Sequence, residues 1–278
     1  MKFLLLLVVL GLRRLDLGWP GWLQNAQRHQ SWFQRCAGRL GEGQRLWWLT
    51  VFLPSVLVAM AFAYSGGSLG ILLKLVLGLA LLLWLLGPES EFRQVDELLV
   101  RGRMNDPQGF ADLAEDEFAV TDGQPGEQAY QRQLMARILG REMQLFATIF
   151  WLVTLGYGAA TFYLLNRAWL QRQSLTQGWL AELDSILSWM PRQLLILCMA
   201  LAGDFSAVMA RMNGNWWQRD DRASQLAAVC HEALSDELTQ EVPASLPEAM
   251  DELEAMQGLL LRCLAVWLIL SALWILLT

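Results

Sequence analysis

Three ionisable or hydroxyl side chains on one short stretch could build a polar site. The stretch 183–205 reads L-D-S-I-L-S-W-M-P-R-Q-L-L-I-L-C-M-A-L-A-G-D-F. Asp184, Ser188 and Arg192 are four residues apart, so they share one face wherever the chain is helical. The sequence allows two interpretations, an Asp184–Arg192 ion pair that fixes the local geometry and a polar pocket that binds a ligand.

Pro191 complicates a single helix through this stretch. Proline has no backbone N–H and disfavours helical geometry at the residue before it. We therefore expect an amphipathic helix at about 179–189, a break, and a second helix that begins near Pro191. Arg192 would then lie at a helix N-terminus, which repels a cation slightly, so it should meet a carboxylate or a phosphate.

Asp204 follows an apolar run and precedes another short apolar segment. An ionisable group at membrane depth is costly and usually faces a partner or a polar cavity. The alternative is an acid at the membrane interface that closes a half-span, with Gly203 as the helix cap.

A second polar cluster flanks the apolar segment 144–165. Arg141 and Glu142 precede it, and Asn166 and Arg167 follow it. These side chains either contribute to a site or anchor a span at the membrane interface.

Composition indicates what kind of protein must position these groups. The chain has 278 residues, of which 55% are hydrophobic and 17% are charged. Soluble domains carry about 25% charged residues, and here the apolar residues occur in blocks, which is typical of a membrane protein. A net charge of −6 makes nucleic acid a poor partner. The spacing of histidines and cysteines predicts no metal site, no disulfide framework and no cofactor.

The apolar blocks predict an all-α, polytopic membrane protein with four long transmembrane helices, two short or half-membrane apolar segments and amphipathic interfacial helices. The long spans are expected at 47–64, 69–87, 146–165 and 258–277, and the short segments at 1–12 and within 183–210. The first short segment has no cleavage site, so we expect it to be retained. The loop 13–46 is the most basic, which favours a cytoplasmic position.

These elements divide the chain into three regions. They are 1–87 with the first hairpin of spans, a cytoplasmic helical and acidic linker region at 88–145, and a membrane region at 146–278. Within 88–145 we expect a helix, an acidic linker and a further helix that starts near Gly126. An acidic loop at 211–257 precedes the last span. Two topologies stay open, because 191–210 either crosses the membrane or does not.

Several motifs resemble a known superfamily of membrane proteins. L-D-S-I-L-S-W-M-P-R at 183–192 resembles the L-D-D-x-x-N-W-x-P-A-R-L signature of the CobD/CbiB family of cobalamin-synthesis enzymes. The segments 15–20 and 162–168 are similar, more loosely, to two other motifs of that family. Y-Q-R-Q-L at 130–134, F-W-L-V-T-L-G at 150–156 and W-M-P-R at 189–192 resemble the AmpE family of the same superfamily.

The AmpE resemblance implies a bacterial inner-membrane protein with a regulatory or sensory role in β-lactamase induction, and hence in antibiotic resistance and peptidoglycan recycling, with a functional link to the AmpD amidase. The superfamily resemblance implies an alternative, a membrane enzyme that binds an anionic or amide-bearing ligand. Ser185 replaces the second acid of the synthase motif, and Glu142 is the only acid in the segment 138–150, where that family carries an acidic motif. A ligase needs carboxylates to hold Mg²⁺ beside ATP, so these departures favour a protein without catalytic residues. A third alternative is a structural partner of another membrane protein.

The candidate polar pocket combines the residue pattern with the resemblance. Its members are Asp16, Asn166, Arg167, Asp184, Arg192 and Asp204, with Arg141 and Glu142 as secondary candidates.

Overall fold

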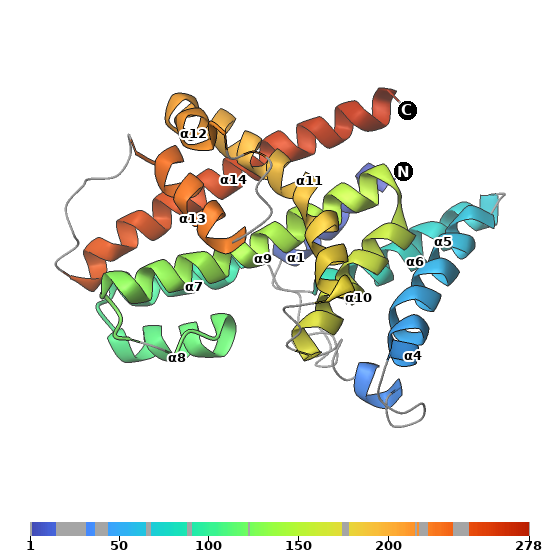
Figure 1. Cartoon of the computed structure of the whole chain (residues 1–278), viewed down its shortest axis with the longest axis horizontal. Helices are drawn as coiled ribbons and strands as arrows, with labels where there is room; N and C mark the ends of the chain where they lie inside the picture. Colours follow the sequence, from blue (N-terminus) through green and yellow to red (C-terminus); the bar gives the residue numbers. More distant parts are fainter. Residues whose placement is uncertain are drawn as a thin grey trace. The chain divides into compact units, whose positions relative to one another are not determined.

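The chain folds into α-helices, as Figure 1 shows along the sequence. This computed structural model describes residues 2–14, 32–36, 44–64, 68–87, 91–121, 123–173, 178–214, 216, 222–235 and 245–277. The helices are α1 (Lys2–Arg14), α4 (Gln44–Trp47), the π-helix η1 (Trp48–Phe52), α5 (Leu53–Tyr64), α6 (Ser68–Leu86), α7 (Glu91–Arg103), α8 (Pro107–Phe118), α9 (Gln128–Thr154), α10 (Tyr157–Gln173), α11 (Trp179–Ala202), α12 (Phe205–Met212), α13 (Arg222–Ala233) and α14 (Leu246–Leu277). The predicted all-α class is confirmed for these residues.

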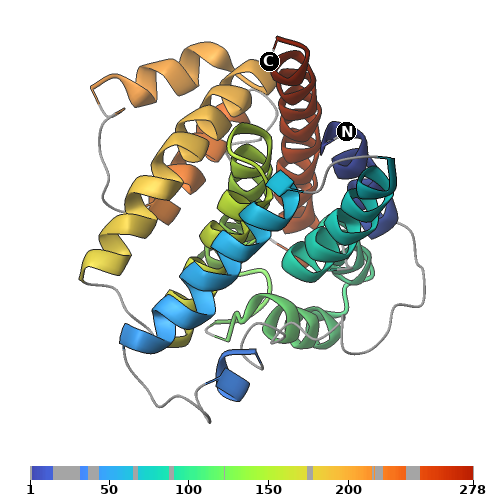
Figure 2. The same cartoon turned by 90° about the vertical axis from the view of Figure 1, so that its right-hand side faces the viewer.

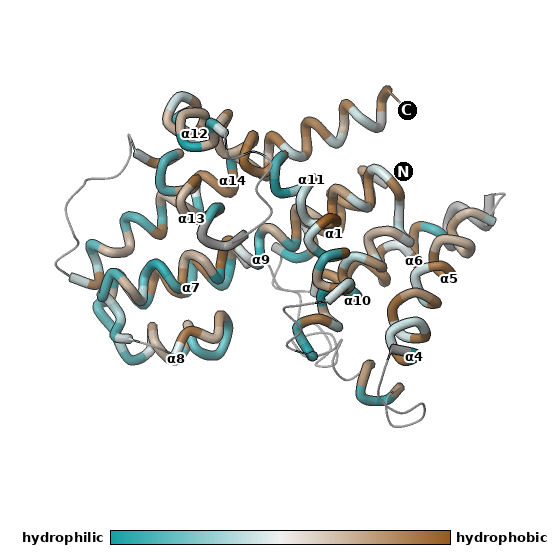
Figure 3. The backbone as a smooth tube through the Cα atoms, in the orientation of Figure 1, coloured by the Kyte–Doolittle hydropathy of each residue, from teal (hydrophilic) through white to brown (hydrophobic). Residues whose placement is uncertain are grey.

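Three helical stretches of the described chain are long and apolar enough to cross a membrane. They are Arg45–Tyr64, Trp179–Ala202 and Leu246–Trp274. Two shorter apolar stretches, Phe3–Arg13 and Lys74–Leu86, accompany them. The hydrophobic residues that dominate α5 and α6 contrast with the mixed composition of α7 and α8 (Figure 3). The chain therefore fits a membrane protein, but four long spans are not confirmed.

The helices belong to two compact units, each built from separate parts of the chain. Unit 1 comprises Met1–Ser90, Ala147–Trp189 and Ser271–Thr278, and unit 2 comprises Glu91–Phe146 and Met190–Leu270. This division differs from the three consecutive regions that the sequence predicts, because α9, α11 and α14 each contribute to both units.

In unit 1, α10 packs against α5, η1 and α6, while α1 lies alongside α6 (Figure 2). The helices α5 and α10 approach closely at Gly158, where a Cβ would lie 2.6 Å from Ala59 Cβ and 3.0 Å from the carbonyl oxygen of Ser55. Small residues on both helices therefore set the distance between α5 and α10.

The predicted span 146–165 is interrupted. The helix α9 ends at Thr154, and α10 begins at Tyr157. Gly156 has φ 92°, in the left-handed region that favours glycine, and its N–H donates to the Trp151 carbonyl oxygen at 2.9 Å. The interruption is thus a helix end capped by a glycine in a left-handed conformation, which hydropathy alone does not reveal.

The predicted break at Pro191 is wrong. The helix α11 runs without interruption from Trp179 to Ala202, with Pro191 inside it. Proline removes the N–H that would bond to the carbonyl of Leu187, four residues earlier. The indole N–H of Trp151 donates to that oxygen at 3.2 Å, so the carbonyl keeps a donor. The predicted elbow and half-span over 183–210 are therefore replaced by one 24-residue helix.

Pro54 creates the same requirement near the start of the first long span. It has no N–H for the carbonyl of Thr50, and the indole N–H of Trp32 donates to that oxygen at 3.4 Å. The backbone widens here into η1, in which the N–H of Leu53 bonds to the Trp48 carbonyl five residues back. Such π-helical turns occur often at functional sites.

The expected short segment at 1–12 forms the helix α1, which extends to Arg14. Arg13 is buried and donates from Nε to the Gly87 carbonyl oxygen at 2.9 Å and from Nη2 to that of Leu86 at 3.3 Å. These carbonyls lie at the C-terminal end of α6, where a cation interacts favourably with the helix dipole. Arg13 thus joins the two helices.

In unit 2, the first helix expected within 88–145 is α7, which buries Phe92, Val95 and Leu98. The acidic linker prediction missed α8. That helix begins after Asp106, whose carboxylate accepts the Gly109 N–H at 3.0 Å. An Asp N-cap followed by Pro at the first helical position is a standard helix start.

The last helix begins earlier than predicted and also serves unit 2. The helix α14 starts at Leu246, so the last twelve residues of the expected acidic loop 211–257 are helical. Its Gln257 Nε2 donates to the Phe92 carbonyl at 3.0 Å and to Asp96 Oδ1 at 2.6 Å. On the exposed side, Arg103 forms ion pairs with Asp251 and Glu254 at 2.6 and 2.7 Å. These contacts attach α7 to the polar end of α14.

Candidate functional site

The best-defined polar group of unit 1 is Asn166, on α10. Its side chain is fully buried, and its Oδ1 accepts the indole N–H of Trp47 at 3.1 Å. An indole N–H can only donate, so the oxygen of the Asn166 amide must face Trp47 and the amide nitrogen must point elsewhere. That nitrogen, Nδ2, has no hydrogen-bond partner among the described residues. A buried amide N–H₂ without an acceptor is costly and calls for an explanation.

Arg167, which follows Asn166 on α10, forms an ion pair with Asp184 of α11. Arg167 Nη1 lies 3.6 Å from Asp184 Oδ2, with the two side chains 23% and 8% exposed. The Nε of Arg167 is buried and has no hydrogen-bond partner among the described residues. Consecutive helical residues point about 100° apart, so Asn166 and Arg167 present donors on adjacent faces of α10.

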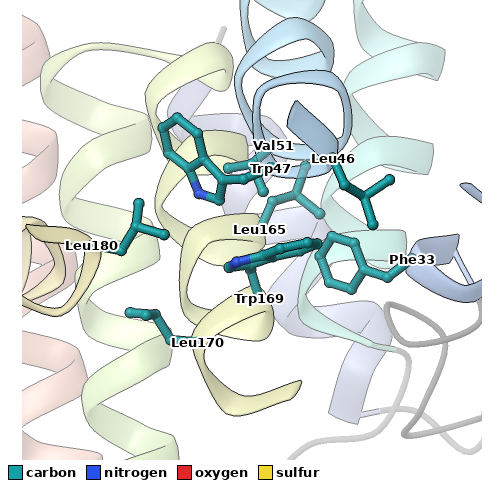
Figure 4. Close-up of a cluster of buried hydrophobic side chains, with 8 residues drawn as sticks. All are labelled: Phe33, Leu46, Trp47, Val51, Leu165, Trp169, Leu170 and Leu180. Carbon is teal, nitrogen blue, oxygen red and sulfur yellow. The ribbon is translucent and has the colours of Figure 1, made fainter. Parts of the chain in front are cut away.

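Trp47, the partner of Asn166, belongs to an apolar cluster of unit 1. Figure 4 shows its eight buried members, which are Phe33, Leu46, Trp47, Val51, Leu165, Trp169, Leu170 and Leu180. The ring of Trp169 meets the edge of Phe33 at a centroid distance of 5.4 Å (Figure 4), and Trp47 packs edge-on against Phe162 and Trp179. This packing fixes the Trp47 ring and keeps water from its hydrogen bond with Asn166, which strengthens that bond.

Four serine and threonine hydroxyls of the apolar helices are satisfied locally. Thr50, Ser55, Thr161 and Ser188 each donate to the carbonyl four residues earlier, at 2.6–2.8 Å. This is the usual solution for hydroxyls inside apolar helices. Ser188, which the sequence placed on the face of Asp184, therefore bonds to the Asp184 backbone and is not a free donor for a ligand.

The remaining predicted site residues lie in unit 2 or outside the described chain. Arg192 and Glu142 are buried, at 2% and 1% exposure. Arg141 donates to Gln94 Oε1 at 3.0 Å and lies 4.7 Å over the ring of Phe118, so it joins α9 to α7 and α8. Asp16 lies outside the described residues. The convergence of all these residues on one pocket stays a prediction.

Asp204 has a structural role that neither interpretation of the sequence named. It follows the end of α11 and is the N-cap of α12, where its Oδ1 accepts the N–H of Ser206 at 2.8 Å and that of Ala207 at 3.0 Å. The Ser206 hydroxyl also donates to it, and this hydrogen bond, followed by that of the Ala207 N–H, lowers the pKa of Asp204 below its usual value. The carboxylate is thus engaged in capping α12.

Sequence reasoning missed Trp47 as a partner of Asn166 and Trp151 as a partner of Leu187. Because Pro191 has no N–H, the sequence indicates that the Leu187 carbonyl needs another donor. No sequence spacing identifies Trp151, 40 residues before Pro191, as that donor.

The donors of unit 1 suit a ligand that accepts hydrogen bonds, such as a carboxylate, a phosphate or an amide carbonyl. Within the part of the chain that the structure describes, no three His, Cys, Asp or Glu side chains are grouped to hold a metal ion. No family model, curated protein or solved structure matches this chain. The site must therefore be interpreted from its own chemistry.

Proposed function

We propose that this chain is a multi-pass inner-membrane protein of a regulatory or sensory kind, which binds an anionic or amide-bearing ligand at Asn166 and Arg167. The observation that carries the proposal is the buried Asn166 amide. Trp47 holds its oxygen at 3.1 Å and leaves the N–H₂ group without an acceptor among the described residues. A ligand oxygen would supply that acceptor.

The ion pair supports recognition of the same ligand class. Arg167 keeps an N–H without a hydrogen-bond partner among the described residues while its Nη1 faces Asp184. A guanidinium held on one side by a carboxylate is oriented, so it loses less entropy when a second acceptor arrives. An arginine and an asparagine together bind a carboxylate or an amide carbonyl with defined geometry.

The sensory role comes from the resemblance to the AmpE family, which covers the whole chain. It connects the protein with β-lactamase induction, with peptidoglycan recycling and with the AmpD amidase. Recycled cell-wall fragments carry both carboxylates and amides, so they belong to the ligand class that these donors suit. The synthase family has a second acid where this chain has Ser185, and further acids in the region of Glu142. The loss of these carboxylates favours sensing over amide-bond synthesis.

Induction in the native cell tests this role. We expect removal of the protein to alter β-lactamase induction and the pools of cell-wall fragments, and Asn166→Ala to reproduce the effect at normal protein levels. Asn213→Ala, at an exposed turn of unit 2, is the control and should behave as wild type. Unchanged induction and unchanged fragment pools after removal would refute the regulatory role.

A further inference from the structure

A cavity of about 450 Å³ lies in unit 1, and Asn166 is not among the residues that line it. Its lining comes from residues 32–36, α5, α6 and α10, namely Trp32, Arg35, Pro54, Val58, Leu81, Trp84, Thr161 and Leu165. The volume is within the range of ligand pockets, about 300–1,000 Å³. Because α5 and α6 both pack on α10, the cavity occupies the space between their side chains.

The lining of the cavity is almost entirely apolar, and the exposed Arg35 is its charged member. Leu165 and Thr161 are buried, and the Thr161 hydroxyl is already bonded to the Tyr157 carbonyl at 2.8 Å. Thr161 therefore offers a ligand no free hydroxyl donor. Because Arg35 is exposed, the cavity reaches the surface of unit 1 beside this side chain. The lining thus suits a molecule with an apolar chain and an anionic head.

The position of the cavity along the helices indicates a bilayer component. Arg45–Tyr64, which includes Pro54 and Val58, is one of the stretches long and apolar enough to span. Pro54 lies nine residues into that stretch, which corresponds to about 13 Å along a helix. Trp84 lies near the end of α6. A chain that enters beside Trp84 and Arg35 and reaches Pro54 would run from the membrane interface toward its middle.

Trp32 is held in the wall of this cavity by the backbone itself. Its indole N–H donates to the carbonyl of Thr50, the oxygen that Pro54 leaves without its helical donor. The π-helical turn η1 covers the same residues. The hydrogen bond of Trp32 therefore compensates for the N–H that Pro54 lacks. This contact fixes the Trp32 ring in the wall of the cavity.

We propose that this cavity binds one acyl chain of an anionic phospholipid, with the lipid phosphate facing Arg35. Charge complementarity selects an anionic headgroup, and the apolar lining selects an acyl chain. The indoles of Trp32 and Trp84 suit the headgroup level, because one end of an indole is apolar and the other is polar. This inference is independent of the ligand proposed for Asn166.

Native mass spectrometry of the delipidated full-length protein in a mild non-ionic detergent tests the proposal. Phosphatidylglycerol and phosphatidylcholine with identical acyl chains would be added in separate titrations. We expect the wild type to bind phosphatidylglycerol about fivefold better, the factor that corresponds to about 1 kcal/mol for one basic residue near an anionic lipid. Equal binding of the two lipids would overturn the assignment of Arg35.

Three variants separate the parts of the site. Arg35→Gln should lose the preference for phosphatidylglycerol, whereas Arg262→Gln, at an exposed arginine of α14, should keep it. Val58→Trp should fill the cavity and lose both lipids. If that variant does not fold, Leu81→Phe makes a smaller obstruction from α6. Binding of both lipids at wild-type strength by the folded obstructed variant would overturn the proposal.

Inorganic phosphate distinguishes a lipid from a soluble anion. Excess phosphate should not displace phosphatidylglycerol, since the acyl chain supplies most of the binding free energy. Displacement would mean that Arg35 holds a free phosphate and that the cavity plays no part, which would also overturn the proposal.

Discussion

The indole N–H of Trp151 donates to the carbonyl oxygen of Leu187 at 3.2 Å, and this is the carbonyl that Pro191 deprives of its helical donor. Trp32 and Thr50 repeat the relationship before Pro54 at 3.4 Å. Two long apolar helices thus contain a proline without a break, because a tryptophan from another part of unit 1 supplies the missing hydrogen bond.

A double-mutant cycle tests this relationship. Trp151→Phe should leave the Leu187 carbonyl without its indole donor and lower the free energy of unfolding by about 1–3 kcal/mol. Pro191→Ala restores a backbone N–H for that carbonyl, so Trp151→Phe should cost clearly less in the Pro191→Ala background. The loss of ring area is the same in both backgrounds and cancels. Denaturant unfolding in mixed micelles provides the measurement, and equal costs would contradict the role of the indole.

The ion pair of the candidate site can be tested by the same kind of cycle. Arg167→Gln, Asp184→Asn and the double variant should show a coupling free energy of about 0.5–3 kcal/mol, the range for residues in contact. The low exposure of Asp184, 8% for its side chain, favours a measurable value over the near-zero coupling of surface pairs. Additive effects of the two substitutions would show that the pair does not hold Arg167 in place.

Close packing of α5 on α10 predicts contrasting effects at two glycines. Gly158→Ala would place a Cβ 2.6 Å from Ala59 Cβ, so the helices must separate, and we expect a loss of about 1–3 kcal/mol in the free energy of unfolding. At Gly140 of α9, an added Cβ would meet no atom within 4 Å, so Gly140→Ala should be neutral or stabilise by up to about 1 kcal/mol. Similar melting temperatures for the two variants would contradict the close contact.

The cap at Asp204 predicts a pH dependence. Hydrogen bonds from Ser206 and Ala207 lower the pKa of this carboxyl in the folded protein. Its stabilising contribution is therefore present above the unfolded pKa of about 3.9 and is lost as the pH falls through the lower folded pKa. Asp204→Asn retains a capping oxygen but does not titrate, so its melting temperature should fall less steeply in that acid range. Parallel pH profiles for variant and wild type would show that the carboxylate charge does not matter.

Local chemistry made several elements predictable. The apolar block 47–64 predicted a span, and the region 88–145 was expected to start with a helix, which is α7. The start of α8 after Asp106 and Pro107 carries an ordinary helix signal that the surrounding acids and glycines concealed. These features depend on neighbours in the sequence, so sequence reasoning can reach them.

Features that depend on residues distant in the sequence could not be predicted from it. Pro191 looked like a break because the donor that rescues its helix, Trp151, comes from α9. Asn166 was chosen as a polar residue beside a span, but the orientation of its amide is set by Trp47, on α4. The role of Asp204 as the N-cap of α12 was not predicted, although its partners, the N–H groups of Ser206 and Ala207, are close in the sequence.

A ligand site at Asn166 is tested most directly by native mass spectrometry of the protein purified from its native membrane in mild detergent. Wild type and Asn213→Ala would be compared with Asn166→Ala and Asp184→Ala. We expect a bound molecule of definite mass, distinct from any phospholipid, on the first two proteins and its loss from the last two. A wild type without such a molecule, or one retained by Asn166→Ala, would contradict a ligand site at Asn166.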